Sequence, residues 1–236
     1  MATAPISDID QLDLAQCRAW IGEAAERTDG RPDKVVDRIH ELALWETLDL
    51  LPMADRPSAL FEAAYRFGLV DLAATWRALA PATAAGTSPM FGEDALIGGG
   101  RLAPLCRARV LGLLAAATRT AVVEAFRYAR ARETGGRPIA QHQAVAVRLA
   151  ELALAERAVA LTAPDLAALA AGSDEGEAAS MRYVAELGAR IARDAVQVAG
   201  AHGYVEGLPF RRLFERIKTL SALLALDAAR AEGAPS

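Results

Sequence analysis

Four long segments with apolar residues spaced three and four apart fill the second half of this chain, and they constrain its fold more than any other feature. Such spacing places the apolar side chains on one face of a helix. The loops between the segments are short, so the helices are expected to pack side by side in antiparallel order. The segments span residues 101–133, 138–163, 177–199 and 210–225. We therefore predict an all-α fold whose main part is a four-helix bundle.

The residues expected to face the interior follow from the same spacing, and Pro138 and Pro164 are read as the start and the stop of the second helix. Composition supports helices, because over half of the residues are apolar and aromatic residues are few. The predicted inward residues are Val145, Leu149, Leu152 and Val159 in the second helix, Val184, Leu187, Ile191, Ala195 and Val198 in the third, and Phe210, Leu213, Ile217, Leu220 and Leu224 in the fourth.

Residues 1–80 predict a small N-terminal helical unit. Its expected helices cover residues 13–26, 33–51, 56–68 and 69–80, the third of them ending on a C-terminal glycine, Gly68. Residues 81–100 are rich in Gly, Pro, Ser and Thr and lack helical periodicity, which is typical of a linker. The predicted division is thus 1–80, a linker at 81–100, and the bundle at 101–236.

Several classes of function are disfavoured by charge and residue usage. A net charge of −4 offers no basic surplus for nucleic acid. No secretory signal and no spanning apolar segment is visible, which predicts a cytoplasmic protein that does not enter a membrane. The two cysteines, Cys17 and Cys106, are expected to be reduced. The three histidines (His40, His142 and His202) show no ligand spacing, so no metal site is expected.

Two turns carry a more specific signal. The first lies in YARARETGGRPIAQHQAV (128–145) and the second in DAVQVAGAHGY (194–204). In this order and at this separation they resemble the C-terminal helical domain of the acyl-CoA dehydrogenases, and the resemblance covers residues 97–225. The matching residues are Arg132, Thr134, Gly136, Pro138, Ile139 and Gln143 in the first turn, and Ala195, Gln197, Gly200, Gly203, Tyr204 and Pro209 in and after the second.

The resemblance implies a site for flavin adenine dinucleotide (FAD) that is shared between subunits. In the family the first turn reaches the pyrophosphate of a neighbouring subunit's FAD, and the second packs near its adenine. The implied cofactor-binding residues are Arg132, Thr134, Gln143, Gln197, Gly200 and Gly203. Their chemistry suits this role, since an arginine forms charge-assisted hydrogen bonds with a diphosphate and glycine allows close backbone approach. The alternative is that the arginine is a solvated helix end and the glycines are helix caps.

The departures from the family pattern concern the catalytic half. Family members carry a β-rich domain between two helical domains, whereas only the 81–100 segment stands there in this chain. The family's catalytic glutamate falls on Leu224 or Ala225, and the alternative position of some relatives falls on 105–107 (Leu, Cys, Arg). Neither place has the carboxylate that abstracting a proton next to a thioester requires. The aromatic residue of the first turn is replaced by Gly135.

Three hypotheses follow. The first is a degenerate, non-catalytic subunit that completes the FAD site of a full-length acyl-CoA dehydrogenase in a homo- or hetero-oligomer. The second is an active FAD-dependent oxidoreductase acting on an acyl-CoA or carrier-bound acyl group, with Glu206 or His202 as acid/base. The third is a helical scaffold without a ligand. Whether the chain is an enzyme stays open at this point.

Overall fold

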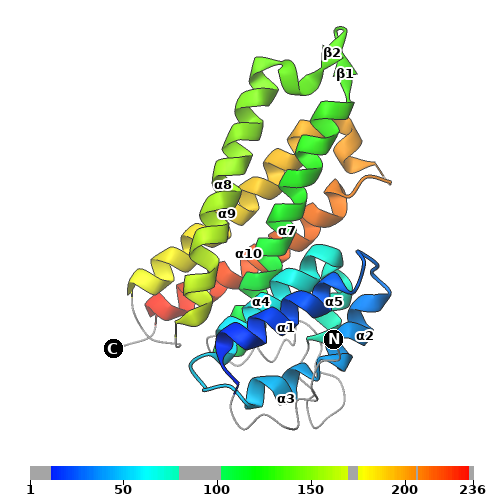
Figure 1. Cartoon of the computed structure of the whole chain (residues 1–236). Coiled ribbons are helices and arrows are strands. Elements are labelled where there is room, and N and C mark those ends of the chain that lie inside the picture. The colour runs from blue at the N-terminus through cyan, green and yellow to red at the C-terminus, as the bar shows by residue number, and fades with distance from the viewer. Residues whose placement is uncertain (1–11, 80–101, 170–174, 206, 234–236) are drawn as a thin grey trace.

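Four long helices form the body of the molecule, which is known from a computed structural model describing residues 12–79, 102–169, 175–205 and 207–233 (Figure 1). The helices α7 and α8 are joined by a small hairpin, and α9 and α10 by a short 3₁₀ turn. Helix α9 packs along α10, and α7 contacts each of the other three. The elements of the bundle are α7 (Pro104–Ala131), β1 (Glu133–Thr134), β2 (Arg137–Pro138), η2 (Ile139–Gln141), α8 (Gln143–Ala168), α9 (Glu175–Ala199), η3 (Gly200–Tyr204) and α10 (Phe210–Gly233).

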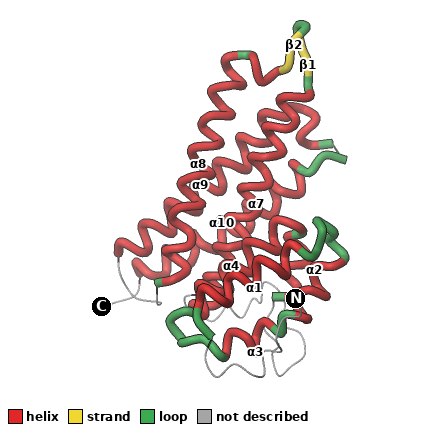
Figure 2. The backbone as a smooth tube through the Cα atoms, in the orientation of Figure 1, coloured by secondary structure: helices red, strands yellow, loops and turns green. Residues whose placement is uncertain are grey.

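The all-α fold and the predicted inward faces are confirmed. Every residue expected to face the interior is buried except Val145, which is partly buried and packs against the core. Within the described residues the two short strands of the hairpin are the exception to helix, as Figure 2 shows in yellow.

The boundaries of the second bundle helix were predicted wrongly at both prolines. Pro138 belongs to the hairpin strand β2, and α8 begins only at Gln143. At the other end Pro164 lies inside α8, which continues to Ala168. A proline inside a helix removes one backbone hydrogen bond and crowds the preceding turn. The last turn of α8 buries Leu166 and Ala167, and this packing offsets the cost.

The N-terminal helices pack on the bundle through the contact of α4 with α7, and both parts share one hydrophobic core. A Cβ at Gly112 would lie 2.5 Å from the carbonyl oxygen of Phe61, so only glycine permits this approach of the two helices. Gly68 was predicted to end its helix but lies within α4, where a Cβ would lie 2.9 Å from Cβ of Ala116. These helices are α1 (Leu14–Glu26), α2 (Lys34–Glu41), α3 (Leu44–Asp49), α4 (Arg56–Val70) and α5 (Leu72–Ala78).

The helix expected over residues 33–51 is in fact two. Ala43 adopts the left-handed conformation, with φ +46°, and separates α2 from α3. The Thr47 hydroxyl donates a hydrogen bond to the carbonyl of Leu42 at 2.9 Å and so satisfies a carbonyl at the break. The proposed linker 81–100 lies outside the described residues, and the division of the chain at that segment stays a prediction.

Candidate functional site

The hairpin between α7 and α8 forms the tip of the bundle, at the top of Figure 1. Glu133 pairs with Pro138, and Thr134 with Arg137. Gly135 and Gly136 fill the turn with φ values of +58° and +76°, a conformation that L side chains rarely adopt. The replacement of the family's aromatic residue by Gly135 therefore coincides with a tight two-residue turn.

The hairpin is held to the start of α8 by hydrogen bonds at its base. The backbone N–H of Ile139 donates to the carbonyl of Arg132 at 2.7 Å. Nε2 of His142 donates to the carbonyl of Thr134 at 3.2 Å, and the Arg137 guanidinium donates to Nδ1 at 3.4 Å. These partners assign the neutral His142 ring a proton on Nε2. His142 therefore stabilises the turn by linking the hairpin to the start of α8.

Arg132 ends α7 and leaves its guanidinium in solvent. Its backbone N–H caps the helix by donating to the carbonyl of Tyr128 at 2.8 Å. Within the described parts of the chain its side chain has no ion-pair or hydrogen-bond partner. Thr134 and Gln143 are exposed beside it, on β1 and on the first residue of α8. The three polar residues predicted at this turn are thus accessible to a ligand.

The second turn separates α9 from α10. Gly200 has φ +59°, so it ends α9 in the left-handed conformation that glycine favours. Gly203 is buried, and a Cβ there would lie 2.9 Å from the carbonyl oxygen of Val196. Gln197 is exposed on the last turn of α9. Gly203 is thus required by packing alone, whereas Gln197 makes no such contribution.

Tyr128 connects the two turns and was assigned no role from the sequence. Its ring centroid lies 6.3 Å from that of His202 in η3 and 5.9 Å from that of Phe210, which it meets edge-on. Because Tyr128 is one helical turn before Arg132, the turn that contains Gln197 and Gly200 lies at the same end of the bundle as the hairpin. The signal available in the sequence was a lone aromatic residue four positions before an arginine, which is too weak to identify such a contact.

Positions that would carry a catalytic carboxylate are filled by other interactions. Leu224 is 0% exposed within α10. At the start of α7, Leu105 and Cys106 are partly buried, and Arg107 is fully buried in an ion pair with Glu177 of α9. Arg107 also donates to the carbonyl of Leu169 at 2.7 Å. The Glu177 carboxylate thus forms a buried ion pair with Arg107. Glu206, the other candidate acid/base, lies outside the described residues.

Both cysteines are free thiols, with Cys17 buried and Cys106 partly buried. Burial raises the pKa of the Cys17 thiol to about 11, so it stays protonated and unreactive near neutral pH. No group of three metal-ligating side chains occurs in the described ranges. Over the same ranges, no helix has the length and apolarity that a bilayer crossing needs.

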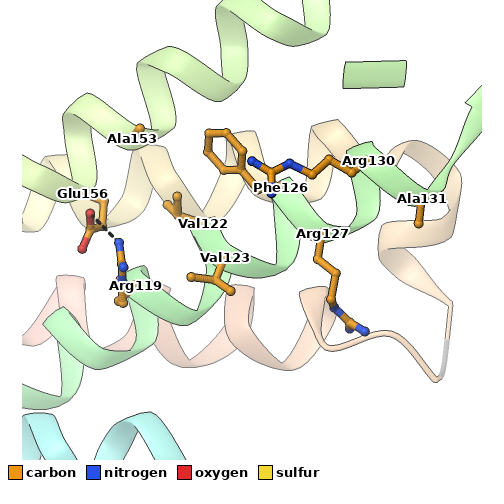
Figure 3. A pocket seen from close by; sticks show the side chains of 9 residues that line it. All are labelled: Arg119, Val122, Val123, Phe126, Arg127, Arg130, Ala131, Ala153 and Glu156. Carbon is orange, nitrogen blue, oxygen red and sulfur yellow. Dashed lines mark hydrogen bonds and ion pairs between the residues drawn. The ribbon is translucent and has the colours of Figure 1, made fainter. Parts of the chain in front are cut away.

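Hollows on the described surface of the bundle include one on α7 and α8 and one at the start of α10. One, of about 680 Å³, lies between α7 and α8 (Figure 3), with Val122 and Phe126 as its apolar part and an ion pair between Arg119 and Glu156 (3.5 Å) beside them. The other, of about 760 Å³, is formed by the loop before α10 and the first turns of that helix. The arginine Arg211 in this second hollow pairs with Glu215 at 3.2 Å.

The sequence of the bundle is similar to that of known proteins. A sequence model described as "Acyl-CoA dehydrogenase, C-terminal domain" matches residues 104–223, which is half of the chain. A 3-(aryl)acrylate reductase of Clostridium sporogenes (strain ATCC 15579) is 32% identical over 117 residues, 48% of this chain and 30% of that protein. An acyl-CoA dehydrogenase of Bacillus subtilis (strain 168) is 35% identical over 116 residues, 47% of this chain and 29% of that protein. The match thus spans less than a third of the length of these curated relatives.

Solved structures also align with part of this chain. Butyryl-CoA dehydrogenase from Megasphaera elsdenii aligns with a TM-score of 0.47 and 20% identity over 61% of this chain and 38% of its own. Glutaryl-CoA dehydrogenase from Mycobacterium smegmatis aligns with a TM-score of 0.47 and 24% identity over 55% and 36% of the two chains.

Proposed function

Because the chain belongs to the acyl-CoA dehydrogenase family through its C-terminal domain, we propose that it is a non-catalytic subunit that completes the FAD site of a full-length partner. The observation that carries this proposal is the Arg132 guanidinium, which is exposed at the tip of the bundle without an ion-pair partner in the described ranges. A diphosphate would satisfy it through charge-assisted hydrogen bonds.

The residues around Arg132 fit a cofactor that approaches from outside. Thr134 and Gln143 present a hydroxyl and an amide at the same turn, and Gln197 and Gly200 present an amide and an open backbone at the neighbouring one. All of these are donors or acceptors that suit phosphate oxygens and an adenine edge. Bound FAD would supply the oxidation chemistry, and this chain would hold and orient its nucleotide part.

The proposal of a non-catalytic subunit rests on what occupies the positions of the base. Abstraction of a proton next to a thioester needs a positioned carboxylate or an equivalent base within hydrogen-bond reach. Leu224 is buried in the core, and Arg107 is committed to Glu177. The substrate of the assembly, an acyl-CoA or a carrier-bound acyl group, would therefore be oxidised by the partner's residues.

The test is to purify the chain alone and after co-expression with a full-length acyl-CoA dehydrogenase subunit. We expect flavin absorbance in the complex and none in the isolated chain. Arg132→Ala should weaken FAD retention in the complex about tenfold, the effect of losing one charge-assisted hydrogen bond of about 1.5 kcal/mol or more. Arg127→Ala is the matched control, because Arg127 is exposed on the same helix but paired with Glu124.

Three results would overturn the proposal. They are tight FAD binding by the isolated chain, turnover of an acyl thioester by the isolated chain, and failure to form a complex with any dehydrogenase subunit. Unchanged FAD retention in both the Arg132→Ala and the Gln197→Ala complexes would argue for a scaffold without a ligand.

A further inference from the structure

The hollow at the start of α10 is basic, although the chain as a whole is acidic. Its volume is about 760 Å³, a size that is typical of small-molecule sites. The lining has three arginines and one glutamate, whereas the net charge of the whole chain is −4. An anion that enters this space therefore meets a surplus of positive charge. We refer to this space, with Arg212 and Arg216 on α10 and Val205 and Leu208 in the loop before it, as the α10 hollow.

Arg212 and Arg216 line the α10 hollow without a counter-charge. The carboxylate in the lining, Glu215, accepts a hydrogen bond from Nε of Arg211 at 3.2 Å and so balances that arginine. Across the described ranges neither Arg212 nor Arg216 has an ion-pair or hydrogen-bond partner. The two lie four positions apart on one face of the helix, where like charges repel each other. Arg216 is also partly buried, which makes an unpaired charge more costly.

The remaining wall of the α10 hollow is largely apolar. Val205 is 55% exposed, and Leu208 and Pro209 are partly buried beside it. Thr120 of α7 also lines the hollow, but its hydroxyl donates to the carbonyl of Ala116 at 2.9 Å and is not available as a donor to a ligand. A ligand that fits both parts of the hollow has an anionic group at the arginines and an apolar body on the loop.

We propose that the α10 hollow binds a phosphate monoester of a small organic molecule, with the phosphate held by Arg212 and Arg216 and the organic part on Val205 and Leu208. A phosphate monoester carries about −1.5 to −2 charge at pH 7, which balances two guanidinium groups. A carboxylate carries a single negative charge and would leave one arginine unbalanced. Guanidinium groups also bind phosphate oxygens through pairs of parallel hydrogen bonds, so both charge and geometry favour a phosphate.

The α10 hollow is distinct from the site proposed for FAD. Arg132, Thr134 and Gln197 do not line it. Thr120, which does, precedes Arg132 by twelve residues on α7, a separation of about 18 Å along the helix. Binding of a phosphate monoester requires neither FAD nor a full-length partner. This proposal therefore goes beyond the proposed function, and either one can fail while the other stands.

The test is titration of the isolated chain with phenyl phosphate, followed by isothermal calorimetry. We expect saturable binding at one site. Arg212→Ala and Arg216→Ala should each raise the dissociation constant about tenfold or more, the effect of losing a charge-assisted contact with the phosphate. Lys218→Ala is the matched control, because Lys218 is exposed on the same helix and carries the same charge but does not line the hollow. Circular dichroism checks that all three variants stay helical.

Two further ligands test the assigned chemistry. Phenyl sulfate has nearly the same shape but a single negative charge, and it should bind about tenfold more weakly than phenyl phosphate. Inorganic phosphate lacks the apolar body and should also bind more weakly.

Arg132→Ala separates the α10 hollow from the proposed FAD site, because this variant should bind phenyl phosphate as the wild type does. The Arg212→Ala variant should in turn retain FAD in the complex with a full-length subunit. The proposal is overturned if phenyl phosphate shows no saturable binding to the wild-type chain. It is also overturned if Arg212→Ala and Arg216→Ala both bind phenyl phosphate with wild-type affinity, or if Arg132→Ala abolishes that binding.

Discussion

Polar residues are exposed to solvent at one end of the bundle and buried in contacts between helices at the other. At the hairpin end Arg132 is exposed at the end of α7, and backbone turns rely on glycines with positive φ. At the other end of α7 Arg107 is enclosed with Glu177, and the backbone N–H of Leu102 donates to the Asp227 carboxylate at 2.6 Å. One end leaves its polar groups exposed to solvent, and at the other end polar groups hold helices together.

Removal of Arg107 should have the largest effect on stability. In the variant Arg107→Met, Glu177 would stay buried without its main counter-charge, and the carbonyl of Leu169 would lose a donor. We expect the free energy of unfolding to fall by about 3–5 kcal/mol, the usual result of breaking one side of a buried pair. Chemical denaturation followed by circular dichroism measures it.

An exposed pair provides the control for Arg107. Arg211 and Glu215 contact each other at 3.2 Å on α10 with more than half of each side chain in solvent. Arg211→Met should change the free energy of unfolding by no more than about 0.5 kcal/mol. If both variants lose the same amount, the contrast between the two ends has no energetic basis.

Leu224 gives the next largest effect. Truncation by Leu224→Ala leaves a cavity in the core and should cost about 3 kcal/mol of unfolding free energy. Leu226→Ala, on the same helix but 39% exposed, should cost under about 1 kcal/mol. A small loss for Leu224→Ala would mean that the position is not a core position, and a carboxylate could then be introduced there without unfolding the chain.

Arg132 should give the smallest effect on stability. Its side chain contacts no partner in the described part of the molecule, so Arg132→Ala should leave the free energy of unfolding within about 0.5 kcal/mol of wild type. The same substitution is expected to weaken FAD retention in the complex. A large loss of stability would show that Arg132 serves the fold, and the hairpin end would then resemble the other end.

The sequence predicted the helix faces well because those faces depend on local periodicity. The apolar stripe from Phe210 to Leu224 is buried as the three-four spacing indicated. The predicted helix ends were wrong where packing against residues distant in the sequence determines the structure. Pro164 stays within α8 because the last turn of that helix is packed, and Gly68 serves a close contact with Ala116 rather than a helix end.

The candidate site was predictable only in part. The two turns could be located from their motifs, but the contact of Tyr128 with His202 joins residues far apart in the sequence. The ion pair of Arg107 with Glu177 links positions separated by 70 residues. The spacing of residues in the sequence does not indicate that Tyr128 contacts His202 or that Arg107 pairs with Glu177.

The contact of Gly112 with the Phe61 carbonyl joins two helices that are synthesised at different times. Helix α4 leaves the ribosome before α7 exists, because Phe61 precedes Gly112 by about fifty residues. At about 5–20 residues per second, the apolar face of α4 waits for several seconds without its partner. The N-terminal helices therefore cannot reach their final packing until the first bundle helix has emerged, and over that interval the face of α4 that receives α7 stays exposed to solvent.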